Sequence, residues 1–116
     1  MMKRSLILVL SLLMLVLCIP ALAESTDWNY DANYAILRGY DGAGGDVVVP
    51  AEIDGFTVDV IGINVFKGDT ITSLTLPETV LELRSNAVAS CEKMTSVTLP
   101  QSLVVINRMN FFSCNA

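Results

Sequence analysis

The sequence contains no histidine among its 116 residues, so it lacks the side chain that most often serves as a base or metal ligand near neutral pH. Serine–histidine and cysteine–histidine catalytic pairs and histidine-based metal centres are therefore excluded. Glu78 and Glu82 come nearest to a general acid–base pair, but nothing predicts a cleft around them, and solvated surface charge is the favoured interpretation. We predict a chain that is not an enzyme, with no catalytic, cofactor-binding or metal-binding residues.

Long apolar runs are also scarce, and the single one lies at the N-terminus. Two basic residues precede the apolar stretch Leu6–Ile19, which leads to the small-x-small site Ala21-Leu22-Ala23. A run of about fourteen residues is shorter than the roughly twenty that a spanning helix needs. Residues 1–23 are therefore predicted to be a secretory signal peptide, and we expect a secreted or cell-surface protein with no membrane span after cleavage.

Basic residues are few, because 7 Lys and Arg stand against 12 Asp and Glu and give a formal charge of −5. Loss of Lys3 and Arg4 with the signal peptide lowers the charge to −7 for residues 24–116. An acidic surface repels phosphates and anionic lipids, and no basic cluster interleaved with aromatic residues offsets this repulsion. Nucleic-acid binding is therefore disfavoured, and we predict no nucleic-acid partner.

The chain does contain an internal repeat, and proline marks its end. Three apolar segments end in proline, namely Val47–Pro50, Leu74–Pro77 and Val97–Pro100, and the last two prolines are 23 residues apart. The first interval is 27 residues, which fits the same unit if five residues are inserted around 53–57 and one is lost after Asp69. A period of 23 residues is typical of leucine-rich repeats.

Apolar residues recur at fixed offsets from these prolines. A unit this short cannot bury its own apolar side chains, so each coil must stack on the next and share its core. We predict a leucine-rich-repeat solenoid, mainly β, in which each repeat supplies one short parallel strand. The predicted inward ladder consists of Val80, Leu83, Val88, Cys91, Met94, Val97, Leu99, Leu103, Ile106, Phe111 and Cys114.

These residues closely resemble the BspA-like leucine-rich-repeat family of bacterial and protist surface proteins. Units of that family read apolar-x-x-Ile-Gly-x-x-Ala-Phe-x-x-Cys-x-x-Leu-x-x-apolar-x-apolar-Pro. The match covers roughly residues 34–116, and Ile61–Phe66 is its closest local copy; Arg84 and Asn107 stand where glycine is expected, and Val88 stands where the aromatic is expected. The resemblance implies a solenoid scaffold and a role in cell-surface adhesion or protein binding, without specifying the ligand.

The segments around the repeats divide the chain further. Residues 24–33 are polar and predicted to be loosely ordered, whereas Tyr34–Leu37 and Val47–Val49 are predicted to form a β-hairpin that caps the first coil, with its turn across Asp41–Asp46. The cap therefore covers 34–50, and about two and a half repeats follow at 51–77, 78–100 and 101–116. The last repeat is incomplete, so we expect a fragment of a longer solenoid, or self-association through the uncapped coil.

Cysteine is rare, with three copies. Cys18 follows Leu17 rather than a small residue, so lipidation is disfavoured. Cys91 and Cys114 occupy the same place in adjacent coils. Neighbouring parallel strands lie about 4.8 Å apart, which permits a disulfide, but a ladder of small buried thiols explains the repetition equally well and is the favoured interpretation.

The predicted binding face is the polar side of the repeat strands, where Ser73 and Thr75 of one coil lie beside Ser96 and Thr98 of the next. Every half-buried strand carries polar residues outside, so this pattern also fits a plain solvated surface. The loop Asp41–Asp46 lacks the ligand spacing of a calcium site and is predicted to be a flexible turn. Four aromatic residues are predicted to pack over the cap rather than to stack on sugars; they are Trp28, Tyr30, Tyr34 and Tyr40.

Three functional hypotheses follow from the sequence. The favoured one is an extracellular adhesion module that presents a recognition surface to a protein or glycan ligand. The second is a structural spacer or self-associating stalk. The third is the N-terminal repeat module of a larger extracellular enzyme. No cofactor is implied by any of them.

Overall fold

The computed structural model describes residues 27–68 and 70–115. The regular secondary structure of these residues consists of β-strands. The predicted signal peptide at 1–23 lies outside the described residues. No helix among the described residues is long and apolar enough to cross a membrane. The strands are β1 (Trp28–Asp31), β2 (Ile36–Tyr40), β3 (Gly45–Val48), β4 (Glu52–Ile53), β5 (Phe56–Thr57), β6 (Val60–Ile61), β7 (Phe66–Lys67), β8 (Ile71–Thr75), β9 (Glu82–Leu83), β10 (Val88–Ala89), β11 (Ser96–Thr98) and β12 (Val105–Ile106).

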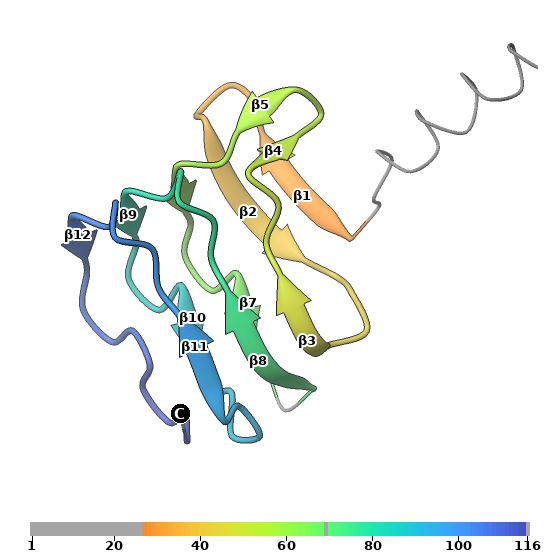
Figure 1. Cartoon of the computed structure of the whole chain (residues 1–116), viewed down its shortest axis with the longest axis vertical. Helices are drawn as coiled ribbons and strands as arrows, with labels where there is room; N and C mark the ends of the chain where they lie inside the picture. The colour runs from red at the N-terminus through yellow and green to blue at the C-terminus, as the bar shows by residue number, and fades with distance from the viewer. Residues whose placement is uncertain (1–26, 69, 116) are drawn as a thin grey trace, which may run out of the picture.

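The strands stack into a β-solenoid, as Figure 1 shows. Three parallel ladders run along it: β2-β6-β9-β12, β7-β10 and β3-β8-β11. The predicted solenoid with parallel strands is confirmed, but each full coil supplies three short strands rather than one. The added strands arise because residues early in each repeat also lie in register with the coil before. Their backbones then pair with the backbone of that coil.

The chain changes direction between these ladders at residues with left-handed backbone angles. Asn64, Asn86 and Met109 recur at one corner with φ of 56°, 57° and 64°. The amide of Asn64 donates to the carbonyl of Asn86, at 3.1 Å, so the corners of successive coils are linked by hydrogen bonds. Asparagine tolerates this conformation better than most residues because its short polar side chain bonds locally, which explains why the first two coils place it there.

The N-terminal cap is a β-hairpin, but its strands are not the predicted ones. β1 pairs antiparallel with β2, whereas β3 joins a different sheet and runs parallel to β8. The prediction that Tyr34–Leu37 and Val47–Val49 pair with each other is therefore wrong. Residues 41–44 cross from one sheet to the other, because the repeat register places Val47 beside Leu74, and that register outweighs the local turn signal.

The prediction that residues 24–33 are loosely ordered is also wrong for the part that is described. Trp28–Asp31 forms β1, and its aromatic side chains hold it to the core. The Trp28 ring lies 4.9 Å from the Tyr40 ring and 6.2 Å from the Phe66 ring, between centroids. The polar residues that alternate with these rings lower the average hydrophobicity of the segment. The segment was therefore predicted to be loosely ordered, although the alternation itself is the period-two pattern of a strand.

The five-residue insertion predicted around 53–57 coincides with a small hairpin. β4 and β5 pair antiparallel across Asp54-Gly55, and these two residues have φ of 52° and 82°, as an Asp-Gly turn of type I′ requires. Phe56 stacks on Tyr30 with ring centroids 5.5 Å apart. The insertion therefore packs against the cap rather than interrupting the solenoid (Figure 1).

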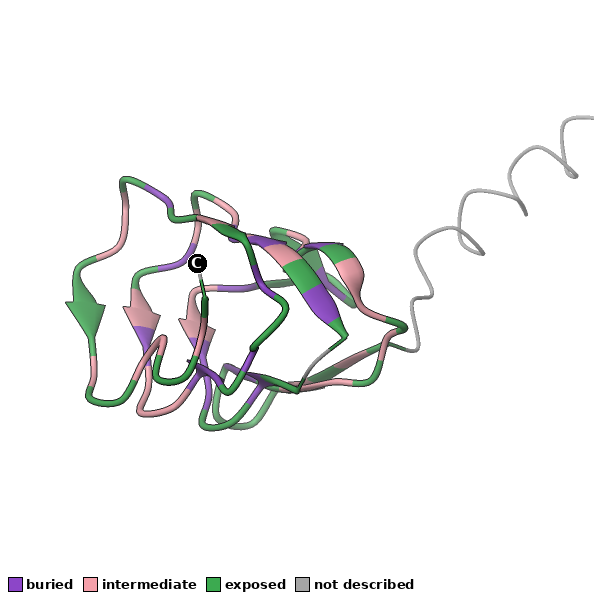
Figure 2. Cartoon of the chain, turned by 90° about the horizontal axis from the view of Figure 1, so that it is seen from below, coloured by how far each residue is buried: buried purple, intermediate pink, exposed green. Residues whose placement is uncertain are grey.

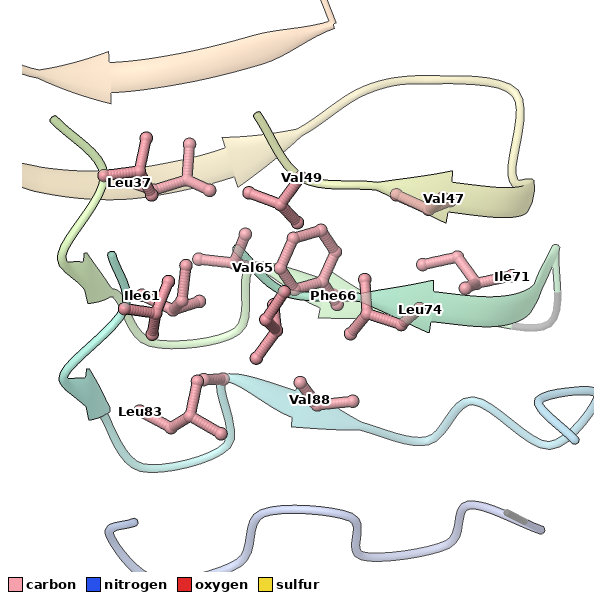
Figure 3. Close-up of a cluster of buried hydrophobic side chains, with 14 of the residues drawn as sticks. Leu37, Val47, Val49, Ile61, Val65, Phe66, Ile71, Leu74, Leu83 and Val88 are labelled. Carbon is pink, nitrogen blue, oxygen red and sulfur yellow. The ribbon is translucent and has the colours of Figure 1, made fainter. Parts of the chain in front are cut away.

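A continuous apolar core fills the coils, as the close-up in Figure 3 shows for the cap and the first two coils. Five residues of the predicted ladder are buried, and they are Val80, Leu83, Val88, Cys91 and Met94. Val97 of the same coil and Leu103, Phe111 and Cys114 of the following coil are partly buried and packed against this core. Phe66 is fully buried and contacts the cap rings of both Trp28 and Tyr40.

Two predicted ladder residues are not buried. Leu99 is 40% exposed and Ile106 is 50% exposed, although Ile106 pairs in register with the buried Leu83. The reason is that, among the described residues, the two sheets end at β11 and β12, so no further strand covers these positions. Figure 2 shows the same gradient, with buried residues along the earlier coils and exposed or intermediate ones along the last.

Candidate functional site

The four residues predicted to form a binding face lie together on the sheet β3-β8-β11. Strand β11 pairs with β8 so that Ser96 lies beside Ser73, and Thr98 lies beside Thr75. All four side chains are exposed or half-buried, while Leu74 between them is buried. The alternation that the sequence predicts for a half-buried strand is therefore present in two adjacent rungs.

Sequence reasoning missed a third rung. Strand β3 places Asp46 beside Ser73 and Val48 beside Thr75. The Ser73 hydroxyl donates to a carboxylate oxygen of Asp46 at 2.7 Å. The segment Val47–Pro50 ends in proline as the later strands do, so its position relative to that proline was enough to align it with them. The prediction had instead assigned this segment to the cap hairpin.

We call this three-rung surface the strip, and it consists of Asp46, Val48, Ser73, Thr75, Ser96 and Thr98. Four hydroxyl groups and one carboxylate offer donors and acceptors at the regular spacing of the strands, about 4.8 Å. Val48 is 67% exposed and adds an apolar contact at one edge. The arrangement suits recognition by hydrogen bonding and contains no nucleophile–base pair.

A cavity of about 350 Å³ adjoins the strip at β11. It is lined by Thr95, Ser96, Val97, Leu99 and Phe111, so it shares Ser96 with the strip. Its volume falls within the usual range for pockets that accept a ligand group. The mixture of apolar walls and a hydroxyl rim favours an apolar side chain or a similar small group.

The two cysteines of the repeats stack on each other. Ala89 and Phe112 form a parallel bridge, which places Cys91 and Cys114, each two residues further on, at the same height in adjacent coils. Both are free thiols, with Cys91 buried and Cys114 half-buried. Burial, followed by the interaction with the neighbouring Cys114, raises the pKa of Cys91 to about 11. A buried thiol with a raised pKa is a poor nucleophile.

The other residues weighed in the sequence contribute to structure. Glu78 accepts a hydrogen bond from the Gln101 amide, and Glu82 accepts one from the Asn107 side chain, so each glutamate bonds separately to the next coil. The Tyr40 hydroxyl accepts a bond from the amide of Gly44 in the 41–46 loop. Trp28, Tyr30 and Tyr40 pack against the core, whereas Tyr34 is 69% exposed. Within 27–68 and 70–115, no group of three or more acidic or cysteine side chains is placed to hold a metal ion.

Comparison with known proteins agrees with this architecture. The crystal structure of a T. pallidum leucine-rich-repeat protein is similar, with a TM-score of 0.66 and 27% sequence identity. The match covers 74% of this chain and 42% of that one, so the chain spans less than half the length of that neighbour. No curated protein matches the sequence. The family model described as BspA type leucine rich repeat region (6 copies) matches residues 53–116, more than half of the chain. The chain is therefore a member of the BspA-type leucine-rich-repeat family.

Proposed function

We propose that this chain is a protein-binding module of a secreted or cell-surface adhesin and that the strip is its contact face. The observation that carries the proposal is the register of β3, β8 and β11, which aligns outward polar side chains in three successive rungs. The family to which the repeats belong supports an extracellular protein-binding role. The sequence signals for export at 1–23 are in keeping with that location.

The dimensions of the strip define what kind of contact it makes. Three strands span about 10 Å across the rungs, which is small beside the roughly 800 Å² that each partner buries in a standard interface. The strip is therefore the centre of an interface whose rim extends over neighbouring residues. The cavity beside β11 supplies the place where an apolar side chain of the partner is anchored, as hot-spot residues are in other interfaces.

The test is a binding measurement with purified extracellular proteins on one array and glycans on another. One variant carries Ser96→Arg with Thr98→Arg, both exposed positions on β11. The matched control carries Ala32→Arg with Ala51→Arg, which are exposed positions outside the strip and change the charge equally. We expect saturable binding to a protein that weakens at least tenfold in the strip variant and is unchanged in the control.

Three results would overturn the proposal. Binding only to glycans would replace the protein ligand by a carbohydrate. Equal loss in both variants would assign the effect to net charge rather than to the strip. Absence of binding to either array by the full-length protein would favour the spacer hypothesis.

Self-association through the third coil is a second candidate, and one observation favours it. Five large apolar residues there are exposed, with Val104 at 78%, Val105 at 43%, Ile106 at 50%, Met109 at 50% and Phe112 at 55%. Scattered apolar residues are ordinary on surfaces, but a group on one coil with unpaired strand edges is prone to association. Light scattering of the full-length protein at increasing concentration tests this, and a constant monomer mass for both wild type and Val104→Asp would refute it.

A further inference from the structure

A second surface lies on a different sheet, along the ladder β2-β6-β9. Leu37 pairs with Ile61, and Ile61 pairs with Leu83; these three buried residues appear as neighbouring rungs in Figure 3. The residues that follow them, Arg38, Gly62 and Arg84, therefore also lie in consecutive rungs. Two arginines are thus separated by one glycine rung, with their Cα atoms roughly 10 Å apart, or twice the strand spacing.

Gly62 lies between the two arginines and packs closely against β2. A Cβ at this position would come within 2.8 Å of the carbonyl oxygen of Leu37 and within 2.9 Å of the Ile36 side chain, so close packing against β2 requires glycine there. A cavity of about 200 Å³ adjoins this point and is lined by Ile36, Arg38, Gly62, Ile63 and Arg84. Its lining therefore includes two arginines and two isoleucines. We call it the arginine cavity.

Each of the two arginines has a carboxylate within ion-pair distance. Nε of Arg38 lies 2.7 Å from a carboxylate oxygen of Asp31, and its guanidinium carbon lies 5.2 Å from the Tyr34 ring centroid. Nε of Arg84 lies 3.9 Å from Glu82, which is longer than a hydrogen bond. Each carboxylate approaches Nε, one of five N–H donors on a guanidinium group, so the donors of the terminal amino groups are not consumed by these ion pairs.

From this arrangement we propose that the arginine cavity binds the carboxylate of an acidic side chain from a partner protein. A guanidinium fork matches the two oxygens of a carboxylate and binds them through paired hydrogen bonds. The cavity is smaller than the roughly 300–1,000 Å³ typical of small-molecule sites, which fits a single side chain. Ile36 and Ile63 contact the methylene groups that carry the carboxylate. This site is separate from the strip and goes beyond the function proposed for it.

The experiment measures backbone amide chemical shifts of the full-length protein during titration with small probes. The main probe is N-acetylglutamate N-methylamide, the matched uncharged probe is its glutamine analogue, and acetate and inorganic phosphate are the two further anions. We expect saturable shifts at the amides of Gly62, Ile63 and Arg84 with the glutamate probe. The glutamine analogue is expected to produce none, and acetate and phosphate are expected to bind more weakly than the glutamate probe.

Three variants locate the binding. Arg84→Gln is expected to weaken the glutamate probe at least tenfold, and Arg84→Lys nearly as much, because lysine keeps the charge but lacks the fork. Arg108→Gln is the control, since Arg108 is an exposed arginine of the third coil outside the cavity. An unchanged amide spectrum away from the cavity verifies that each variant is folded.

Four outcomes would overturn carboxylate binding at this site, and each is distinct from a failure of the strip. They are the absence of saturable shifts at Gly62, equal binding of the glutamine analogue, phosphate binding tighter than the glutamate probe, and loss of binding in Arg108→Gln equal to that in Arg84→Gln. Acetate binding as tight as that of the glutamate probe would refute the side-chain assignment, because the isoleucine walls would then contribute nothing.

Discussion

Phe66 joins the N-terminal cap to the solenoid, and its removal should destabilise the whole domain. Its side chain is fully buried, and its ring contacts two cap aromatics, with centroid distances of 6.2 Å to Trp28 and 5.8 Å to Tyr40. Truncation of a buried phenylalanine to alanine costs about 3–5 kcal/mol. Total stabilities of domains are about 5–15 kcal/mol, so Phe66→Ala is expected to remove a large fraction.

Urea unfolding followed by tryptophan fluorescence measures this loss directly. Trp28 is the only tryptophan, and because its ring lies beside Phe66, its emission reports on the cap. With a urea dependence of about 2 kcal/mol per molar, a loss of about 4 kcal/mol lowers the midpoint by about 2 M. The native emission maximum is also expected to shift to longer wavelength, since the cavity left by Phe66 admits motion and water at the indole.

The control for Phe66→Ala is Phe56→Ala. Phe56 is 46% exposed and stacks on Tyr30 alone, with centroids 5.5 Å apart, so its truncation is expected to cost below about 1.5 kcal/mol, on the scale of one aromatic pair. The reasoning is refuted if Phe66→Ala shifts the midpoint no more than Phe56→Ala does, or if the Trp28 emission of the native protein is the same with and without Phe66.

Two further predictions concern the backbone corner and the stacked thiols. Met109 has a φ of 64° at the corner where earlier coils use asparagine, so Met109→Asn is expected to raise the unfolding free energy by about 1 kcal/mol, and an unchanged or lower urea midpoint would contradict this. The pKa of Cys91 is raised from 9.0 to about 11 in the folded protein, so the unfolded chain loses this proton first, and stability is expected to fall as pH rises from about 9 to about 11. Thermal unfolding at these pH values should show a shallower decline in Cys91→Ala than in wild type, and equal slopes would refute the assignment.

The spacing of apolar residues was enough to predict the solenoid, because a ladder needs only a fixed offset. Val88 and Cys91 keep their offset from Pro77, and both are buried in the structure. Side-chain identity at a single position matters less than recurrence, since neighbouring coils bury one another's apolar groups. Leu99 directly precedes Pro100, as the buried Leu76 directly precedes Pro77, and yet Leu99 is exposed. The pattern therefore predicts the direction of a side chain but not whether another coil covers it.

The strand partners of the cap were beyond local sequence signals. Asp41–Asp46 is rich in glycine and aspartate, which favours a tight turn between its flanking strands. In the structure the flanking strands β2 and β3 belong to separate ladders, because each gains more by continuing a parallel ladder than by pairing with the other. The missed rung of the strip and the missed arginine cavity have this same origin. Arg38 was assigned to a hairpin rather than aligned with Gly62 and Arg84.

Asn110 illustrates a role that repeat alignment cannot predict, and its removal gives a sharp test. The Phe66 amide donates to the backbone carbonyl of Ala87, but one coil later the Val88 amide donates to the side-chain oxygen of Asn110 at 3.1 Å. This replacement occurs where the backbone of Phe111 is left-handed, with a φ of 61°. The Asn110 amide group also donates to the carbonyls of Arg84 and Asn107, both at 2.9 Å.

Asn110→Ala removes all three of these bonds and leaves the partly buried Val88 amide without its acceptor. The two lost donated bonds cost about 1 kcal/mol each, and the unpaired Val88 donor costs about 1–3 kcal/mol, so we expect a loss of about 3–5 kcal/mol. Asn110→Asp keeps the oxygen that Val88 needs and loses only the two donated bonds. We therefore compare hydrogen exchange at the Val88 amide after correction for the change in global stability. The corrected exchange rate should rise in Asn110→Ala and should stay close to that of the wild type in Asn110→Asp. Equal exchange at Val88 in the two variants would mean that the side-chain oxygen does not substitute for the backbone carbonyl and that the third coil is held by its apolar contacts alone.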